Sequence, residues 1–147
     1  MFNKKFFLCI FLSNIINAYD GSSKIPDLEI KMLSGEKTTI YKLLEDGPLL
    51  IDFWATWCAP CKKAMVHYEK MQRQYKDQGF KIIAVNQDTP KSFSKVKSYI
   101  RSKKYSFLVG LDPNKKIGRK LNVVLLPTLI LLDINGVVVW RHQGFIP

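Results

Sequence analysis

The chain has 147 residues, of which 47% are hydrophobic and 24% charged, a balance that suits one folded domain and excludes disordered and collagen-like chains. Its 23 Lys and Arg residues outnumber 12 Asp and Glu residues, but they are scattered in pairs, which favours a solvated basic surface over a nucleic-acid site. Three cysteines are too few for a disulfide scaffold or a four-cysteine zinc site.

The sequence predicts a secretory signal peptide over residues 1–18. Two lysines precede a mostly apolar stretch, residues 6–16, which is too short to span a bilayer, and Ala18 supplies a small residue before a cleavage point. An uncleaved short anchor is the alternative, because Ile16 stands where a small residue is usual. Cleavage would remove Cys9 and leave a domain over residues 19–147. Because a signal peptide directs export, we expect this domain to lie in a compartment where disulfides persist.

The exported part begins with two predicted extended segments, residues 25–33 and 38–43, joined by a turn at Ser34 and Gly35. Residues 49–54 then form an unbroken apolar run, which is typical of a strand buried on both faces. Apolar residues at three- and four-residue spacings predict a helix over residues 60–78.

The second half continues the alternation of strands and helices. Residues 80–86 and 105–111 predict buried strands with a helix over residues 91–103 between them, and a short helix ends near residue 121. Residues 128–142 predict a hairpin that turns at an Asn-Gly pair. The order predicts an α/β fold with a parallel sheet and an antiparallel edge.

Two cysteines lie where the strand over residues 49–54 passes into the helix over residues 60–78. The N-terminus of a helix carries partial positive charge, which favours a thiolate, so Cys58 is the predicted nucleophile. Cys61 lies one helical turn later, close enough for a disulfide and on the core side. We therefore expect Cys61 to resolve mixed disulfides.

Residues 51–62, with the sequence IDFWATWCAPCK, resemble the active-site segment of the thioredoxin superfamily. A Leu-Pro-Thr triplet before the final hairpin strengthens the likeness. With its export signal, N-terminal extension and inserted helix and strand over residues 91–111, the chain is similar to the exported TlpA/ResA-like thiol-disulfide oxidoreductases over about residues 25–147. The resemblance implies a thioredoxin-like mixed sheet flanked by helices, and the closing C-terminal helix of that fold has no counterpart in the sequence.

The resemblance also implies roles for single residues. Pro127 would be a cis-proline beside the disulfide, flanked by Leu126, which presents backbone groups to the substrate, and by Thr128. A proline that only starts a strand is the alternative. Asp52 matches the buried acid that assists proton transfer at the second cysteine, and an acid exposed at a strand end is the alternative to it.

Three residues of the motif would form the rest of the substrate-binding surface: Trp57, Ala59 and Pro60. Trp57 is expected to be exposed, with a core tryptophan as the alternative. Among the departures from the family, Ala64 stands where exported members usually carry Glu. Asp52 would then do the proton transfer alone.

The sequence thus predicts an exported enzyme that reduces disulfides of partner proteins, with the haem-site cysteines of apocytochrome c as a candidate substrate. The resemblance implies a membrane thiol donor of the DsbD or CcdA type, and a location in the bacterial periplasm or at the outer face of the cytoplasmic membrane. We expect no cofactor and no stable membrane span. We also expect no metal, because His67 and His142 do not have zinc-finger spacing. A disulfide oxidant or isomerase, and a non-catalytic basic binding module with a structural disulfide, are the alternatives.

Overall fold

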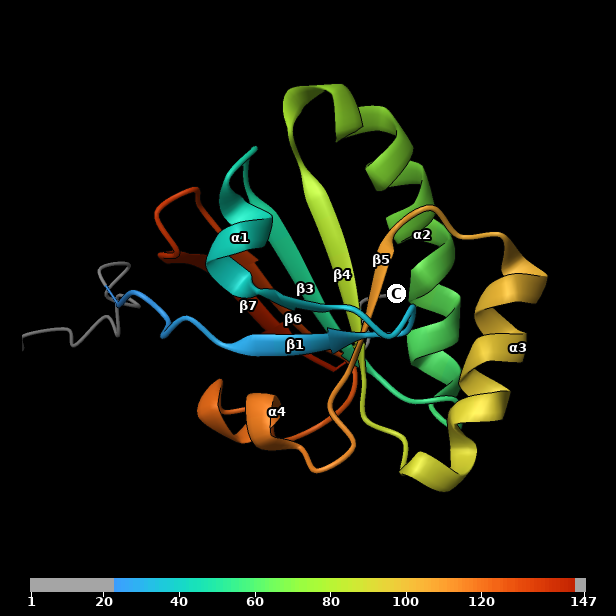
Figure 1. Ribbon diagram of the computed structural model, residues 1–147. Helices are drawn as coiled ribbons and strands as arrows, with labels where there is room; N and C mark the ends of the chain where they lie inside the picture. The colour runs from blue at the N-terminus through green and yellow to red at the C-terminus, as the bar shows by residue number, and fades with distance from the viewer. Residues whose placement is uncertain (1–22, 145–147) are drawn as a thin grey trace, which may run out of the picture.

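A computed structural model describes residues 23–144, which form one seven-stranded mixed sheet with helices on both faces (Figure 1). The predicted signal peptide, with Cys9, lies outside the described residues. The strands are β1 (Glu29–Met32), β2 (Lys37–Thr39), β3 (Leu49–Trp54), β4 (Lys81–Asn86), β5 (Leu108–Leu111), β6 (Thr128–Leu132) and β7 (Val138–Gln143). The helices are α1 (Ile40–Leu44), α2 (Ala59–Tyr75), α3 (Phe93–Lys103) and α4 (Lys116–Lys120), and short 3-10 turns cover Lys76–Gln78 and Pro90–Ser92.

The strands lie in the order β2-β1-β5-β4-β3-β6-β7. The central strands β3, β4 and β5 run parallel, while β6 and β7 form the antiparallel edge that the hairpin predicts. At the other edge, β1 and β2 form an antiparallel pair, and β1 also pairs antiparallel with β5. The predicted fold class is therefore confirmed.

One predicted element is wrong in part. Residues 38–43 were expected to be extended, but the extended part ends at Thr39 and a helix begins at Ile40. The Thr39 side-chain oxygen accepts a hydrogen bond from the Lys42 N–H (3.3 Å), which caps the helix. Ile40, Leu43 and Leu44 share the buried side of this short turn, so burial against the sheet stabilises it.

Strand β3 is buried on both faces, as predicted, and it separates two apolar cores. Leu49, Ile51 and Phe53 belong to the core on the side of α1 and α4, whereas Leu50 and Trp54 belong to the core on the side of α2 and α3 (Figure 1). Side chains of a strand alternate between faces, so Asp52 shares the α2 side with Leu50 and Trp54. None of the helices in the described residues is long and apolar enough to cross a membrane.

Two glycines allow the turns before β3 and β4 to touch. Gly79 has φ +78° and Gly47 has φ +157°, and each packs its backbone against the other turn. A Cβ on Gly79 would overlap the carbonyl oxygen of Asp46, and a Cβ on Gly47 would lie 2.6 Å from the Gly79 oxygen. The two parallel strands therefore start from a shared contact that admits no side chain at either glycine.

Candidate active site

The two cysteines predicted to react lie at the start of α2 and form a disulfide, with their Cα atoms 5.3 Å apart. Cys58 is the N-cap of the helix, and its Sγ accepts a hydrogen bond from the Cys61 N–H (3.3 Å). Cys61 is fully buried, whereas Cys58 is 4% exposed, so Cys58 is the outer sulfur of the pair. A substrate that approaches from solvent meets Cys58 first.

The loop before Pro127 lies against the core that holds this disulfide. The Leu126–Pro127 peptide bond is cis, and Leu126 packs against the core cluster that contains both cysteines. Thr128 is fully buried, and its hydroxyl donates a hydrogen bond to the Leu125 carbonyl (2.6 Å). The sequence predicted a cis-proline at this place, and the structure has it.

Asp52 lies in the middle of β3, between Ala84 of β4 and Leu129 of β6, and it is fully buried. Neither carboxylate oxygen has a hydrogen-bond partner within residues 23–144. Burial raises the pKa of Asp52 from 3.8 to about 8, and the nearby Tyr68 hydroxyl, which does not reach hydrogen-bonding geometry, opposes the rise. The alternative of a solvent-exposed acid is excluded, and this carboxyl can accept and release a proton near neutral pH.

Three apolar residues of the motif flank the cysteines. Trp57 is 69% exposed beside Cys58, as predicted, and Ala59 is also exposed, while Pro60 is half-buried. Trp57 therefore presents a large aromatic face to solvent next to the outer sulfur.

Two exposed apolar residues next to the cis-proline loop were not singled out from the sequence. Val124 is 83% exposed and Leu125 is 47% exposed. They belong to the apolar run over residues 123–126. Such a run is typical of a buried strand, but the strand that follows it begins only at Thr128. The only sequence signal for their exposure is that this run stops at a proline.

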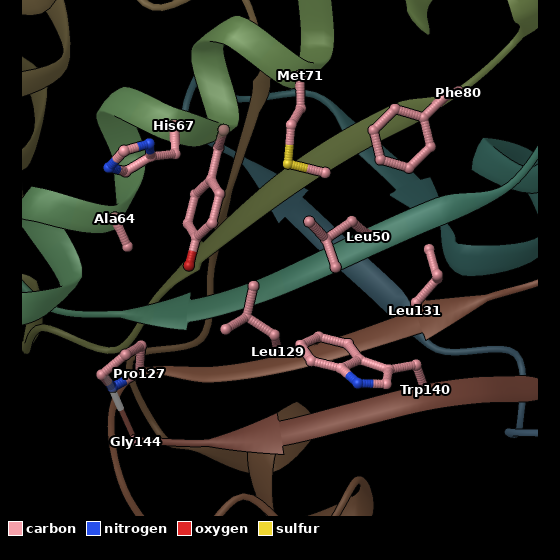
Figure 2. A pocket seen from close by; sticks show the side chains of 11 residues that line it. Leu50, Ala64, His67, Met71, Phe80, Pro127, Leu129, Leu131, Trp140 and Gly144 are labelled. Atoms are coloured by element: carbon pink, nitrogen blue, oxygen red, sulfur yellow. The ribbon is translucent and has the colours of Figure 1, made fainter. Parts of the chain in front are cut away.

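An apolar groove of about 410 Å³ lies between α2 and the sheet, with Pro127 on its wall. Figure 2 shows Ala64, His67 and Met71 on the helix across from Leu129, Leu131 and Trp140 on the strands. The absence of a carboxylate at Ala64 thus leaves this wall apolar, and among the lining residues only the Tyr68 hydroxyl, the His67 ring and the Trp140 indole offer polar side-chain groups.

The two histidines do not lie together in a ligand set. His67 is exposed on α2, and His142 stacks on Trp140 of β7, with ring centroids 5.9 Å apart. In the part of the chain that the structure describes, no group of three or more His, Cys, Asp or Glu residues could hold a metal ion.

Comparisons with known proteins agree with this geometry. The family described as Redoxin matches residues 21–147. The Thioredoxin-like protein YneN of Bacillus subtilis is 36% identical over 81% of this chain and 69% of its own length. The Thiol-disulfide oxidoreductase ResA of Bacillus thuringiensis subsp. konkukian is 30% identical over 81% of this chain and 67% of its own length. A crystal structure from Chlorobium tepidum, described as a thiol:disulfide interchange protein DsbE, has a TM-score of 0.77 at 31% identity and covers 85% of this chain and 86% of its own.

Proposed function

The chain belongs to the Redoxin family and is a ResA-like thiol-disulfide oxidoreductase of the thioredoxin superfamily, and from that premise we propose that it reduces disulfides of exported partner proteins. One observation carries the proposal: a disulfide-forming Cys58–Cys61 pair at a helix N-terminus, with a buried acid and a cis-proline loop on the same core. Relatives named as oxidoreductases favour this enzyme over the non-catalytic binding module.

In the proposed reaction, the Cys58 thiolate attacks one sulfur of a substrate disulfide. The attack forms a mixed disulfide and releases one substrate thiolate. Cys61 then loses its proton to Asp52 and attacks the Cys58 sulfur, which forms the Cys58–Cys61 disulfide and releases the second substrate thiolate. Two electrons pass to the substrate, and the proton held by Asp52 returns to solvent or to the leaving thiolate.

The residues around the disulfide are the proposed substrate-binding surface. A substrate segment would lie along the backbone beside the cis-proline, at Leu126, Pro127 and Thr128. The motif residues Trp57, Ala59 and Pro60 would contact its other side. The exposure of Trp57 and Ala59 supports this assignment.

The direction of electron flow, the location and the partners are also proposals. Proline between the cysteines resembles the reducing members of the superfamily, and residues 1–18 have the pattern of a signal peptide ahead of a domain over residues 19–147. A reductase in an oxidising compartment needs electrons from outside, so we infer a membrane thiol donor of the DsbD or CcdA type. Apocytochrome c, with its pair of haem-site cysteines, is the proposed substrate in the bacterial periplasm or at the outer face of the cytoplasmic membrane.

The reduction potential of the Cys58–Cys61 couple tests the direction. Equilibration of the exported chain with dithiothreitol or glutathione, followed by thiol alkylation, should give a value below about −220 mV. A value above about −180 mV would make the protein an oxidant or isomerase. A Cys61→Ser variant should trap partners as mixed disulfides on Cys58, and the Cys58→Ser, Cys61→Ser double variant is the matched control that should trap none.

A further inference from the structure

A buried carboxylate at the end of β4 holds the loop that leads into the active-site helix. Asp88 Oδ2 accepts a hydrogen bond from the Thr56 N–H (2.7 Å), and Oδ1 accepts one from the Thr56 hydroxyl (2.8 Å). The Asn86 side-chain amide donates to Oδ2 (2.7 Å) and its carbonyl oxygen accepts from the Asp88 N–H (3.1 Å). Asp88 is 4% exposed, so this small network is shielded from water.

The negative charge of Asp88 has no cation beside it. None of the four salt bridges within residues 23–144 involves Asp88, and the groups that donate to its carboxylate are neutral. Asp88 therefore brings into the loop a negative charge that no salt bridge among the described residues balances.

The charge lies close to Cys58. Thr56 precedes Cys58 by two residues, and two residues span at most about 7 Å, so Asp88 Oδ2 lies within about 10 Å of the Cys58 backbone nitrogen. The loop is folded rather than extended, since the Cys58 N–H donates to the Ala55 carbonyl (3.0 Å). Asp88 and Cys58 are both 4% exposed, so salt and water screen them less than charges on the surface, and a carboxylate and a thiolate at these positions oppose each other.

We propose that Asp88 is a positioning residue for thiol-disulfide exchange: its carboxylate fixes Thr56, and its charge disfavours a thiolate on Cys58 and so makes the couple more reducing. Reduction of the disulfide takes up two electrons and two protons and gives the dithiol. The Cys58 thiol then loses a proton to become the thiolate. Asp88 acts against this last step, whereas the N-terminus of α2 favours it, and the balance of the two contributes to the potential.

Two variants test the charge, each with a matched control. Asp88→Asn removes the charge, and Thr56→Lys places a cation beside it. Asp112→Asn removes an equally buried, hydrogen-bonded carboxylate at the end of β5, two strands away from β3. Thr56→Val removes the hydroxyl alone. The readouts are the reduction potential at pH 7 and the rate at which iodoacetamide alkylates reduced Cys58.

Asp88→Asn and Thr56→Lys should each move the equilibrium constant with dithiothreitol about tenfold toward the dithiol, which is about 30 mV. In both variants iodoacetamide should alkylate reduced Cys58 several-fold faster than in the wild type, because a larger fraction of Cys58 is thiolate. For the two control variants, the equilibrium constant with dithiothreitol and the alkylation rate should both stay within about twofold of the wild-type values. If each charge variant matches its own control, the proposal is wrong, and a lower melting temperature without a change in potential would mean that Asp88 only stabilises the loop.

This inference rests on the proposed function in taking Cys58 as the attacking thiol. The two can fail separately. A wild-type potential above about −180 mV would contradict the reductase but leave the comparison between variants intact. A wild-type potential below about −220 mV with no effect of either charge variant would contradict only the role of Asp88.

Discussion

Replacement of the buried acid by its amide, Asp52→Asn, should remove a large pH dependence of stability. Burial raises the pKa of Asp52 to about 8 in the folded protein, compared with 3.8 for an exposed group. Between these values the unfolded chain releases the proton while the folded chain keeps it. The folded state therefore binds more protons, and the free energy of unfolding falls as pH rises from about 4 to 8. At 1.36 kcal/mol per pH unit, the free energy of unfolding falls by about 6 kcal/mol over the full interval between the two pKa values.

Chemical denaturation followed by tryptophan fluorescence measures this effect. The oxidised wild type, Asp52→Asn and the control Asp77→Asn are unfolded at each pH from 5 to 9. Asp77 is an exposed carboxylate after α2, so its variant should follow the wild type. The wild type should lose several kcal/mol relative to Asp52→Asn between pH 5 and 8, and the difference should level off above pH 8.

Parallel stability curves for the wild type and Asp52→Asn over pH 5 to 8 would refute this reasoning. Such a result would mean that the Asp52 carboxyl is already ionised in the folded protein at pH 5, as it is in the unfolded chain, so that folding does not raise its pKa. Its proposed role as the proton acceptor for Cys61 near neutral pH would then also be lost.

Three other substitutions have distinct expected outcomes. Gly79→Ala should lower the free energy of unfolding in urea by about 3 kcal/mol or more, because its Cβ would overlap the Asp46 carbonyl. Gly35→Ala should lower it by only about 1 kcal/mol, because no atom lies within 4 Å of its Cβ. Equal losses would contradict the close contact at Gly79. Met65→Ala should cost about 2–5 kcal/mol, since this side chain is fully buried, and a loss under about 1 kcal/mol would mean that the site collapses around the gap. Trp57→Ala should change stability by less than about 0.5 kcal/mol but slow the reduction of insulin more than that of a small aromatic disulfide; an equal effect on both would argue against docking on Trp57.

The sequence was sufficient where the structure depends on local patterns. The apolar run of β3, the apolar spacing along α2 and the Asn-Gly hairpin each extend over enough residues to define their elements. The cysteine pair could be placed at a helix N-terminus for the same reason. The buried position of Asp52 was implied by the resemblance to the thioredoxin superfamily, and the structure excludes the exposed acid that the sequence left open.

Features that depend on distant contacts could not be predicted in this way. The five-residue helix from Ile40 depends on one cap and on burial against the sheet, and three residues of extended chain precede it. Asp88 and Thr56 are 32 positions apart, and only the alignment of β3 with β4 brings them together. The exposure of Val124 is likewise set by the path of a loop, since its residue type alone favours burial.

The contact between Gly47 and Gly79 has a consequence for a residue that it never touches. In the register of β3 and β4, Leu49 lies opposite Lys81 and Asp52 lies opposite Ala84. A slip of β3 by one residue would turn the carboxyl of Asp52 away from α2 and toward α1, where there is no disulfide. The two glycines at one end of the sheet therefore help to decide whether the acid in the middle of β3 faces the same side as the thiols beyond its far end. We expect inactive variants to arise at these glycines although they lie at the end of β3 away from the disulfide.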